Sequence, residues 1–211
     1  ASSLCSAIAP LYIVPTQGPV TVRFYAPASA LSFAVPLGLY VDRLSAVMMV
    51  LISGVGTIIY TYSLGYMYQD PHERRYLALI GLTTFVLLCM VSSANLMMLF
   101  VFWQLLSYLL YLLAHNHVHA ATLAGAFRTF TLLRLGDVAF LAGTVLAYQL
   151  YGTLEFPDLF AKATETTVTL SPLPGWEIDG VTAVTLLLFI GGMSKSAQFP
   201  LHVWLPDSME G

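Results

Sequence analysis

A single lysine, Lys195, ends an apolar run that reads LLLFIGGMSK. If this run is a helix, the lysine side chain tilts back over Gly191 and Gly192, which leave space beside the ammonium group. Pro200 removes a backbone N–H five residues later, which predicts that the helix breaks or kinks just past Lys195. Broken helices at membrane depth line cavities or are buried in protein, and transporters use them at ion sites. Lys195 is therefore a candidate proton carrier, and the alternative is a lysine that snorkels to the membrane interface.

A second group of charges lies in the stretch FRTFTLLRLGDVAFLAG, where Arg134 precedes Asp137 by three residues. One helical turn separates the two side chains, so they can neutralise each other. Thr144 and Tyr148 follow on the same predicted face as Asp137. Because charges inside a membrane are costly, the pair indicates either a functional site on an ion path or a self-compensated structural ion pair.

A polar face follows one helical stretch whose other side is made of Leu, Val and Phe. Its members stand at i, i+3, i+4, i+7 and i+11, and they are Gln104, Ser107, Tyr108, Tyr111 and His115. This spacing places them on one side of a helix. Two interpretations remain open, a hydrogen-bonding seam between helices and a hydrated ion path.

Histidines supply weaker signals. His115, His117 and His119 alternate in HNHVH, but the surrounding sequence offers no fourth metal ligand, which favours a solvated or proton-collecting loop over a metal site. His202 lies just beyond the predicted break and is a candidate to relay protons from Lys195, although an ordinary hydrogen-bonded histidine would also fit. We predict no metal site, cofactor site or catalytic residue in this chain.

The composition defines the class of protein that must position these residues. Hydrophobic residues make up 58% of the chain and charged residues only 9%, unlike a soluble domain. We predict an all-α polytopic membrane protein. The net charge of −3 is spread over dispersed residues, which argues against nucleic-acid binding. Cys5 and Cys89 lie in apolar surroundings and are expected to be packing residues.

The hydrophobic runs divide the chain into segments. Residues 1–40 are predicted to hold the end of a span and an extramembrane hairpin, and the loop before the last span is predicted to contain a short amphipathic helix around PDLFAKA. The spans predicted within residues 41–211 are about 44–67, 77–92, 95–114, 121–151 and 181–199. The chain begins without Met and stops at DSMEG, so we expect a fragment with spans missing at both ends.

The charged loops predict the orientation. Arg74 and Arg75 lie on one side of the predicted spans, and the acidic loop at about 152–180 lies on the other. By the positive-inside rule, the Arg74 side is cytoplasmic. We expect a multi-pass protein of the bacterial inner (plasma) membrane.

Four stretches together carry a family resemblance: YVDRLSAVMM, ANLMMLFVFWQLLSYLLYLL, AFRTFTLLRLGDVAFLAG and GGMSKSAQFPLHVWLPDSMEG. Over about residues 40–211 the chain resembles the antiporter-like, proton-translocating membrane subunits shared by complex I, above all its L subunit, and the Mrp cation/proton antiporters. The resemblance implies a helical bundle of two inverted five-helix repeats, each with a discontinuous helix. It also implies that Lys195 is the central proton-carrying lysine and that Arg134 and Asp137 belong to the family's R-x-G-D helix.

One position departs from that pattern. The family has Trp-Glu on the third span, and the glutamate pairs with the lysine of the broken helix, whereas this chain has Trp103-Gln104. Glutamine keeps the shape and the hydrogen bonding but cannot hold the charge. A lysine–carboxylate switch of the complex I type would therefore need Asp137 or a residue outside this chain.

The third and fourth predicted spans are also similar to the membrane subunit (DabB) of DabAB-type inorganic-carbon transporters. This resemblance implies a DabA-like partner, a zinc protein resembling β-carbonic anhydrase, and an ion gradient, expected to be of H+, that drives CO2 hydration to bicarbonate. The zinc would be on the partner, so the chain would be a transporter subunit and not an enzyme by itself. The alternatives are a pumping subunit of NADH:quinone oxidoreductase or of an Mrp antiporter, and a non-conducting membrane scaffold.

Overall fold

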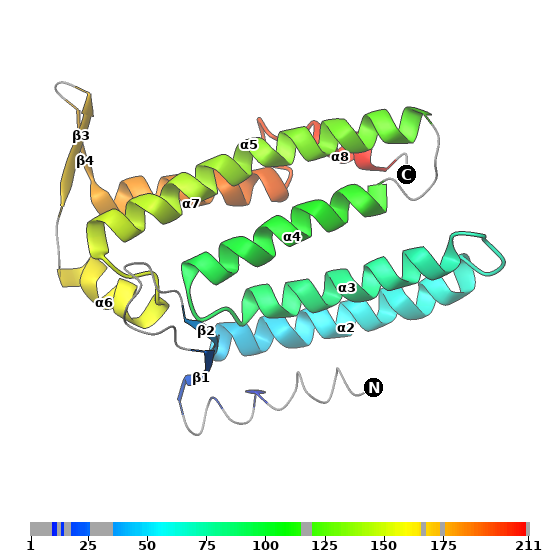
Figure 1. Cartoon of the computed structure of the whole chain (residues 1–211), viewed down its shortest axis with the longest axis horizontal. Coiled ribbons are helices and arrows are strands. Elements are labelled where there is room, and N and C mark those ends of the chain that lie inside the picture. Colours follow the sequence, from blue (N-terminus) through cyan, green and yellow to red (C-terminus); the bar gives the residue numbers. More distant parts are fainter. Residues whose placement is uncertain are drawn as a thin grey trace. The chain divides into compact units, whose positions relative to one another are not determined.

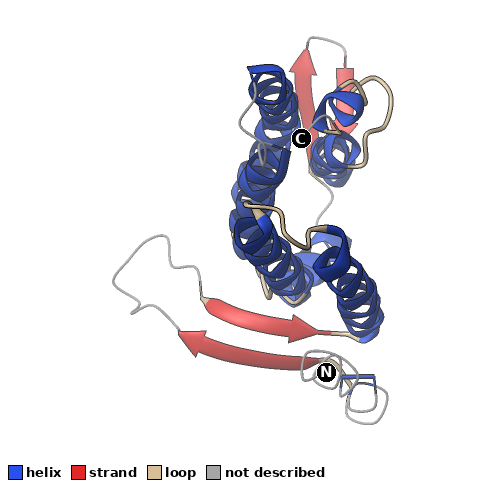
Figure 2. Cartoon of the chain, turned by 90° about the vertical axis from the view of Figure 1, so that its right-hand side faces the viewer, coloured by secondary structure: helices blue, strands red, loops and turns tan. Residues whose placement is uncertain are grey.

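A computed structural model describes residues 10–11, 14, 18–25, 36–114, 120–165, 168–173 and 176–209. The chain divides into two compact units, residues 1–119 with 211 and residues 120–210, and each unit is described by itself. Figure 1 shows the elements in chain order, and Figure 2 shows that helices dominate and that the strands form short hairpins. The predicted all-α membrane bundle is confirmed. The predicted end of a span at residues 1–14 lies largely outside the described residues.

The described residues of the first unit include a hairpin and three long helices. The β-prone segment before the first helix forms the antiparallel strands β1 (Val20–Tyr25) and β2 (Leu37–Val41). The helices are α2 (Arg43–Tyr66), α3 (Glu73–Val91) and α4 (Leu96–Ala114). Helix α3 begins at Glu73, four residues before the start of the span predicted at about 77–92.

Side-chain caps fix where two of these helices begin. The Asp42 carboxylate accepts a 2.7 Å hydrogen bond from the Ser45 amide at the start of α2. The Asn95 side chain accepts from the Met98 amide at 2.7 Å and donates to the Pro36 carbonyl, also at 2.7 Å. Asn95 therefore caps α4 and ties it to the residue that precedes β2.

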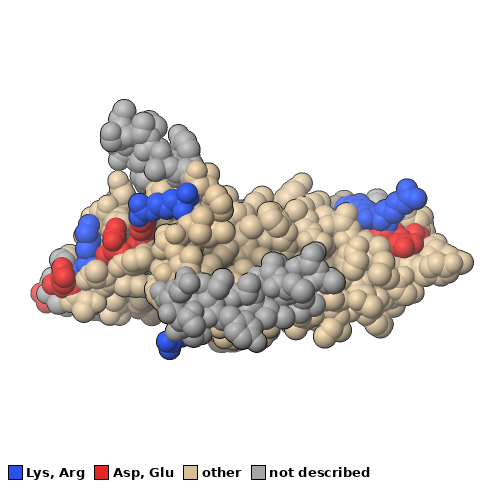
Figure 3. Space-filling view, turned by 90° about the horizontal axis from the view of Figure 1, so that it is seen from below, with Lys and Arg blue, Asp and Glu red and all other residues tan. Residues whose placement is uncertain are grey.

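Helices α3 and α4 pack through leucine and valine side chains. The buried cluster consists of Leu79, Val86, Leu106 and Leu109. Many other apolar side chains of this unit are exposed, and Ile58 on α2 is 70% exposed. Figure 3 shows broad uncharged areas of the surface between groups of charged side chains. Among the residues that the structure describes, four helices, including Leu123–Tyr151 of the second unit, are long and apolar enough to cross a membrane, which accounts for this exposure.

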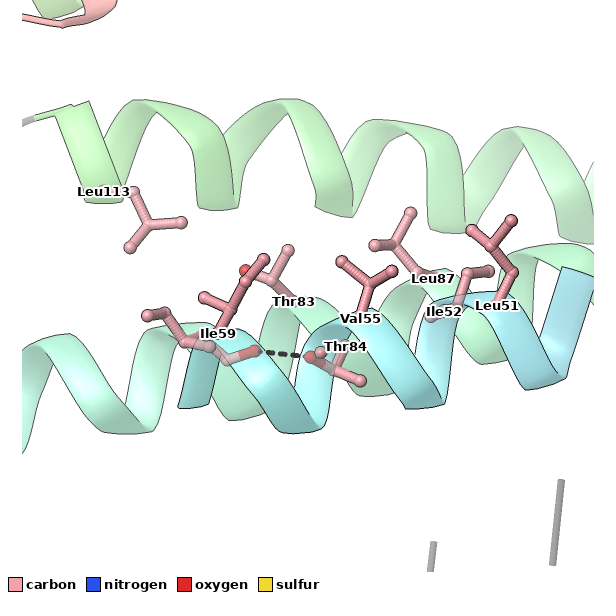
Figure 4. Close-up of a pocket in the computed structure, with 10 residues that line it drawn as sticks. Leu51, Ile52, Val55, Ile59, Thr83, Thr84, Leu87 and Leu113 are labelled. Atoms are coloured by element: carbon pink, nitrogen blue, oxygen red, sulfur yellow. Dashed lines mark hydrogen bonds between the residues drawn. The ribbon is translucent and has the colours of Figure 1, made fainter. Parts of the chain in front are cut away.

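An apolar cavity of about 310 Å³ lies between α2 and α3 with Leu113 of α4 at one side (Figure 4). Its two threonine hydroxyls are occupied within their own helix. Thr83 donates to the Leu79 carbonyl at 2.7 Å, and Thr84 donates to the Ile80 carbonyl at 3.0 Å, the bond drawn in Figure 4. The other lining side chains are aliphatic apart from Gly56.

The second unit is built on two helices that lie side by side, α5 (Ala120–Tyr151) and α7 (Gly180–Lys195). Between them the chain forms α6 (Phe156–Glu165), which contains the predicted amphipathic helix, and the hairpin of β3 (Thr169–Leu173) and β4 (Trp176–Asp179), which the sequence did not predict. A short helix, α8 (Trp204–Ser208), follows α7 after a break. Helix α7 stops at Lys195, four residues before the end of the span predicted at about 181–199.

Small residues let α5 and α7 approach closely. A Cβ atom on Gly136 would overlap the side chain of Ser194, and one on Gly191 would come within 2.8 Å of Phe140. Gly192, by contrast, has open space where its Cβ would be. Of the two glycines expected beside Lys195, Gly191 is thus a helix-packing contact and only Gly192 faces free space.

The two adjacent glycines provide a matched test of this packing. Gly191→Ala should lower the stability of the full-length protein by about 1–3 kcal/mol, because overpacking forces α7 away from Phe140. Gly192→Ala should leave stability unchanged or raise it by up to about 1 kcal/mol, because its Cβ would meet no neighbour and alanine favours the helix more than glycine. Thermal unfolding in detergent measures both variants. Equal effects would contradict the packing described for α5 and α7.

Candidate functional site

The carboxylate of Asp137 lies between two cations. Its Oδ1 is 3.9 Å from Lys195 Nζ, and its Oδ2 is 3.5 Å from Nη1 of Arg134. The side chains of Asp137 and Lys195 are 3% and 9% exposed, whereas that of Arg134 is 39% exposed. Together the three groups carry one excess positive charge when all are ionised, and this excess disappears when Lys195 is neutral.

Helix α5 positions the acidic side of this cluster. Arg134 and Asp137 are three residues apart, so they share a face of the helix. The guanidinium of Arg134 also stands 4.6 Å above the ring of Phe130, one turn earlier, which restrains its position. Gly136 lets Ser194 of α7 approach α5 next to Asp137. This close approach brings Lys195, the residue after Ser194, near the carboxylate.

The end of α7 positions the lysine. Ala197 adopts a left-handed conformation with φ of 48°, and the Gln198 amide donates to the Met193 carbonyl at 3.1 Å. This 6→1 bond around a left-handed residue is a Schellman-type helix end. The break predicted just past Lys195 is present. Its cause differs from the predicted one, because the helix has already ended before Pro200 could clash with the Ser196 carbonyl.

The predicted polar residues of α4 belong to the first unit. The core contacts on α3 are made by the leucine side of α4, so Gln104, Ser107 and Tyr108 lie on the side that points away from α3. Ser107 is fully buried and donates to the Trp103 carbonyl at 3.3 Å, Gln104 is half-buried, and Tyr108 is 50% exposed. Their assignment to an ion path stays a prediction.

The histidines give no further site geometry. His202 is exposed on the connection between α7 and α8, and its ring lies 5.9 Å from that of Phe199. Its role as a proton relay from Lys195 stays a prediction. His115, His117 and His119 lie outside the described residues. Within the part of the chain that the structure describes, no three His, Cys, Asp or Glu side chains are grouped to hold a metal ion.

Two residues of this region, Trp204 and Thr129, were not singled out from the sequence. Trp204 is buried at the start of α8, and its Nε1 donates to the Ser194 carbonyl at 2.7 Å. The hydroxyl of Thr129 on α5 donates in turn to the Trp204 carbonyl at 3.2 Å. The sequence signal for Trp204 was its indole side chain, shortly after the predicted break. An indole N–H requires a hydrogen-bond partner if it is buried.

These features define a polytopic helical membrane protein with a discontinuous helix and a buried cluster of charges at the break. Residues 93–211 match the model of the family described as the transmembrane part of NADH:quinone oxidoreductase and Mrp antiporters, and residues 28–77 match that of the N-terminus of complex I chain 5. The chain belongs to the NADH:quinone oxidoreductase/Mrp antiporter membrane family.

Two curated relatives illustrate the range of this family. The chain is 39% identical over 177 residues to the probable inorganic carbon transporter subunit DabB1 of Halothiobacillus neapolitanus, covering 82% of this chain and 30% of the relative. It is 41% identical over 181 residues to NADH-quinone oxidoreductase subunit L of Neisseria meningitidis, covering 83% of this chain and 27% of the relative. The chain thus spans less than a third of the length of these relatives.

Solved structures share the fold. The Mrp complex from Dietzia sp. aligns with a TM-score of 0.75 and 22% identity, over 99% of this chain and 22% of that chain. Respiratory complex I from Thermus thermophilus aligns with a TM-score of 0.72 and 22% identity, over 98% of this chain and 41% of that chain.

The charge cluster predicts a specific pattern of stability. Asp137→Asn leaves Lys195 and Arg134 without this carboxylate and should destabilise the full-length protein by about 3 kcal/mol, since an unpaired buried charge is costly. Lys195→Met in the same chain removes the more buried cation and should recover a large part of that loss. A double-mutant cycle in detergent measures the coupling. Purely additive effects would show that the two side chains do not interact.

Proposed function

We propose that this chain is the part of an ion-translocating, antiporter-like membrane subunit that contains one of its proton-transfer centres. Lys195 is the group that gains and loses the proton, and Asp137 is its counter-charge. The observation that carries this proposal is the buried Asp137 carboxylate at 3.9 Å from Lys195, at the end of a broken helix. Membership in the NADH:quinone oxidoreductase/Mrp antiporter family supports it.

The proposed chemistry follows from the shared carboxylate. When Lys195 is protonated, Asp137 is attracted by two cations, and when Lys195 is neutral, Arg134 remains as the cation of the cluster because its guanidinium stays charged. In a medium of low dielectric constant, this change alters strong Coulomb interactions across a few ångströms. Proton loading at Lys195 is thereby linked to the positions of the side chains around it.

The same geometry addresses the missing glutamate of the third span. Gln104 cannot supply a negative charge, so the Lys195 ammonium needs a carboxylate from elsewhere. Asp137 fills this role in the proposal, with Arg134 on its other oxygen. Gln104, Ser107 and Tyr108 would contribute hydrogen-bonding groups for water along the path, and His202 would pass protons beyond the break.

For the whole protein we propose coupling of this proton path to inorganic-carbon uptake, with a DabA-like partner that carries a zinc site resembling that of β-carbonic anhydrase. The 39% identity to DabB1 supports this assignment, as does Gln104 at the position of the complex I glutamate. The exposed Arg74 and Arg75 support an inner-membrane protein with their side in the cytoplasm.

The second candidate is a pumping subunit of NADH:quinone oxidoreductase or of an Mrp antiporter, which the 41% identity to subunit L favours. Purification of the full-length protein with its partners distinguishes the two. A co-purifying chain with a mononuclear Cys/His/Asp zinc site supports inorganic-carbon uptake. Flavin and iron–sulfur clusters in the complex would overturn it in favour of the redox enzyme.

Replacement of Lys195 tests the proton-transfer centre. In cells that need the transporter for growth in air, Lys195→Ala should abolish growth while the amount of assembled complex stays normal, because no titrating group remains at the break. Lys162→Ala is the matched control. Lys162 is an exposed lysine whose Nζ donates to the Tyr151 carbonyl at 2.9 Å, so its loss should leave growth intact.

Growth of the Lys195→Ala cells at the wild-type rate would contradict the proton role. Carbon uptake that is insensitive to uncouplers, combined with tolerance of changes at Lys195 and Asp137, would indicate a non-conducting scaffold instead.

A comparison of Asp137 with Gln104 tests which residue supplies the counter-charge. Asp137→Asn should lower ion-coupled transport by about a hundredfold, a typical loss when a group that controls proton transfer is disabled. Gln104→Leu should have a much smaller effect, because it removes no charge. Uptake in cells with equal amounts of complex gives the comparison. A strong loss of transport from Gln104→Leu, with little loss from Asp137→Asn, would show that a residue of α4 controls proton transfer and that Asp137 does not.

A further inference from the structure

Trp204 connects the two sides of the helix break. It is 6% exposed and is the first residue of α8, and its indole Nε1 donates to the carbonyl of Ser194, in the last turn of α7, at 2.7 Å. Its own carbonyl accepts the hydroxyl of Thr129 on α5 at 3.2 Å. One residue thus links α5, α7 and α8.

The carbonyl of Ser194 belongs to a helix end, where the last four carbonyls have no partner within the helix. Gly192 and Met193 have theirs satisfied by amides of the turn, from Ser196 at 3.0 Å and Gln198 at 3.1 Å. Ser194 itself is fully buried, so its carbonyl needs a donor inside the protein. The indole of Trp204 supplies this donor from the far side of the break.

This hydrogen bond acts directly on the backbone of Lys195. The bound carbonyl belongs to the peptide group that joins Ser194 to Lys195, and a peptide group is planar. The Ser194 side chain packs against Gly136, the neighbour of Asp137. The indole therefore restrains the peptide group from which the lysine side chain starts, on the side where α7 meets the carboxylate.

We propose that Trp204 is a positioning residue for Lys195. Its indole N–H holds the end of α7 against α5 and so sets the approach of the Lys195 ammonium to Asp137, while Thr129 holds Trp204 in place. The effect on transport rests on the proposed function of Lys195, but the effect on the position of the lysine does not. A movement of α8 would be transmitted to Lys195 through this bond.

Trp204→Phe tests the proposal, because phenylalanine keeps an aromatic ring and removes the N–H donor. The probe is trace acetylation of the full-length protein in its native membrane with acetic anhydride, followed by peptide mass spectrometry. Labelling of Lys195 relative to the exposed Lys162 should become about tenfold faster, the factor that corresponds to leaving one buried carbonyl without its donor. Val203→Ala, at the exposed neighbouring position, is the control and should leave the ratio unchanged.

Thr129→Val provides a second variant that keeps the indole. It removes the hydroxyl that anchors Trp204 and should raise Lys195 labelling in the same direction, by a smaller factor. Thr131→Val is its matched control on the same helix, because the Thr131 hydroxyl donates to the Phe127 carbonyl of α5 at 2.9 Å. If Trp204→Phe fails to assemble, the two threonine variants carry the test.

The pH profile of transport separates positioning from a general structural role. Trp204→Phe should shift the profile at a normal amount of complex, whereas a merely structural residue would lower the amount and leave the profile unchanged. Unaltered Lys195 labelling in both Trp204→Phe and Thr129→Val would overturn the proposal. If Lys195→Ala retains transport while Trp204→Phe still accelerates labelling, the proposed function fails and the positioning role stands.

Discussion

The buried carboxylate of Asp137 is the constraint on which the second unit depends. A carboxylate that is 3% exposed requires cations or donors around it, and its two oxygens face Lys195 and Arg134. Both cations reach it only because α7 ends at Lys195 and because α5 presents Arg134 one turn before Asp137. The packing of α5 against α7 and the position of the helix break therefore both place the charged groups around Asp137.

Close packing of α5 and α7 holds these charged groups in position. Gly136 and Gly191 bring the two helices close at the level of the charges, and the indole of Trp204 replaces the hydrogen bond that the helix loses at its end. Such close contacts between small residues are a general means of joining helices in membranes. The first unit differs, since its described helices α3 and α4 pack through leucine and valine, and many apolar side chains of its helices are exposed.

The charged residues of this site could be predicted individually from the sequence. Lys195, Asp137 and Arg134 stand out because charges are rare in apolar runs, and the pairing of Arg134 with Asp137 follows from helical spacing. The sequence offered Asp137 or a residue outside this chain as the carboxylate for Lys195. It could not decide between them, because the choice depends on which faces of two distant segments pack together. Trp204 was missed since its type is that of an ordinary core residue.

The helix boundaries show the same limit. Pro200 correctly indicated a break, yet a left-handed Ala197 ends the helix earlier, in a conformation that alanine rarely adopts. The hairpin of β3 and β4 was missed because Pro172 within β3 is unfavourable for a strand. In both places the backbone departs from the local preference of one residue.

In the proposed mechanism, the geometry of the ion pair of Lys195 and Asp137 follows the protonation of the lysine. Experimental structures of the full-length protein in its complex, determined at an acidic and an alkaline pH that bracket the titration of Lys195, would show this dependence. Asp137 should be the carboxylate that faces Lys195 at acidic pH, and the Nζ–Oδ1 distance should be longer at alkaline pH. An unchanged distance at both pH values, or a lysine paired with a carboxylate from outside this chain, would contradict it.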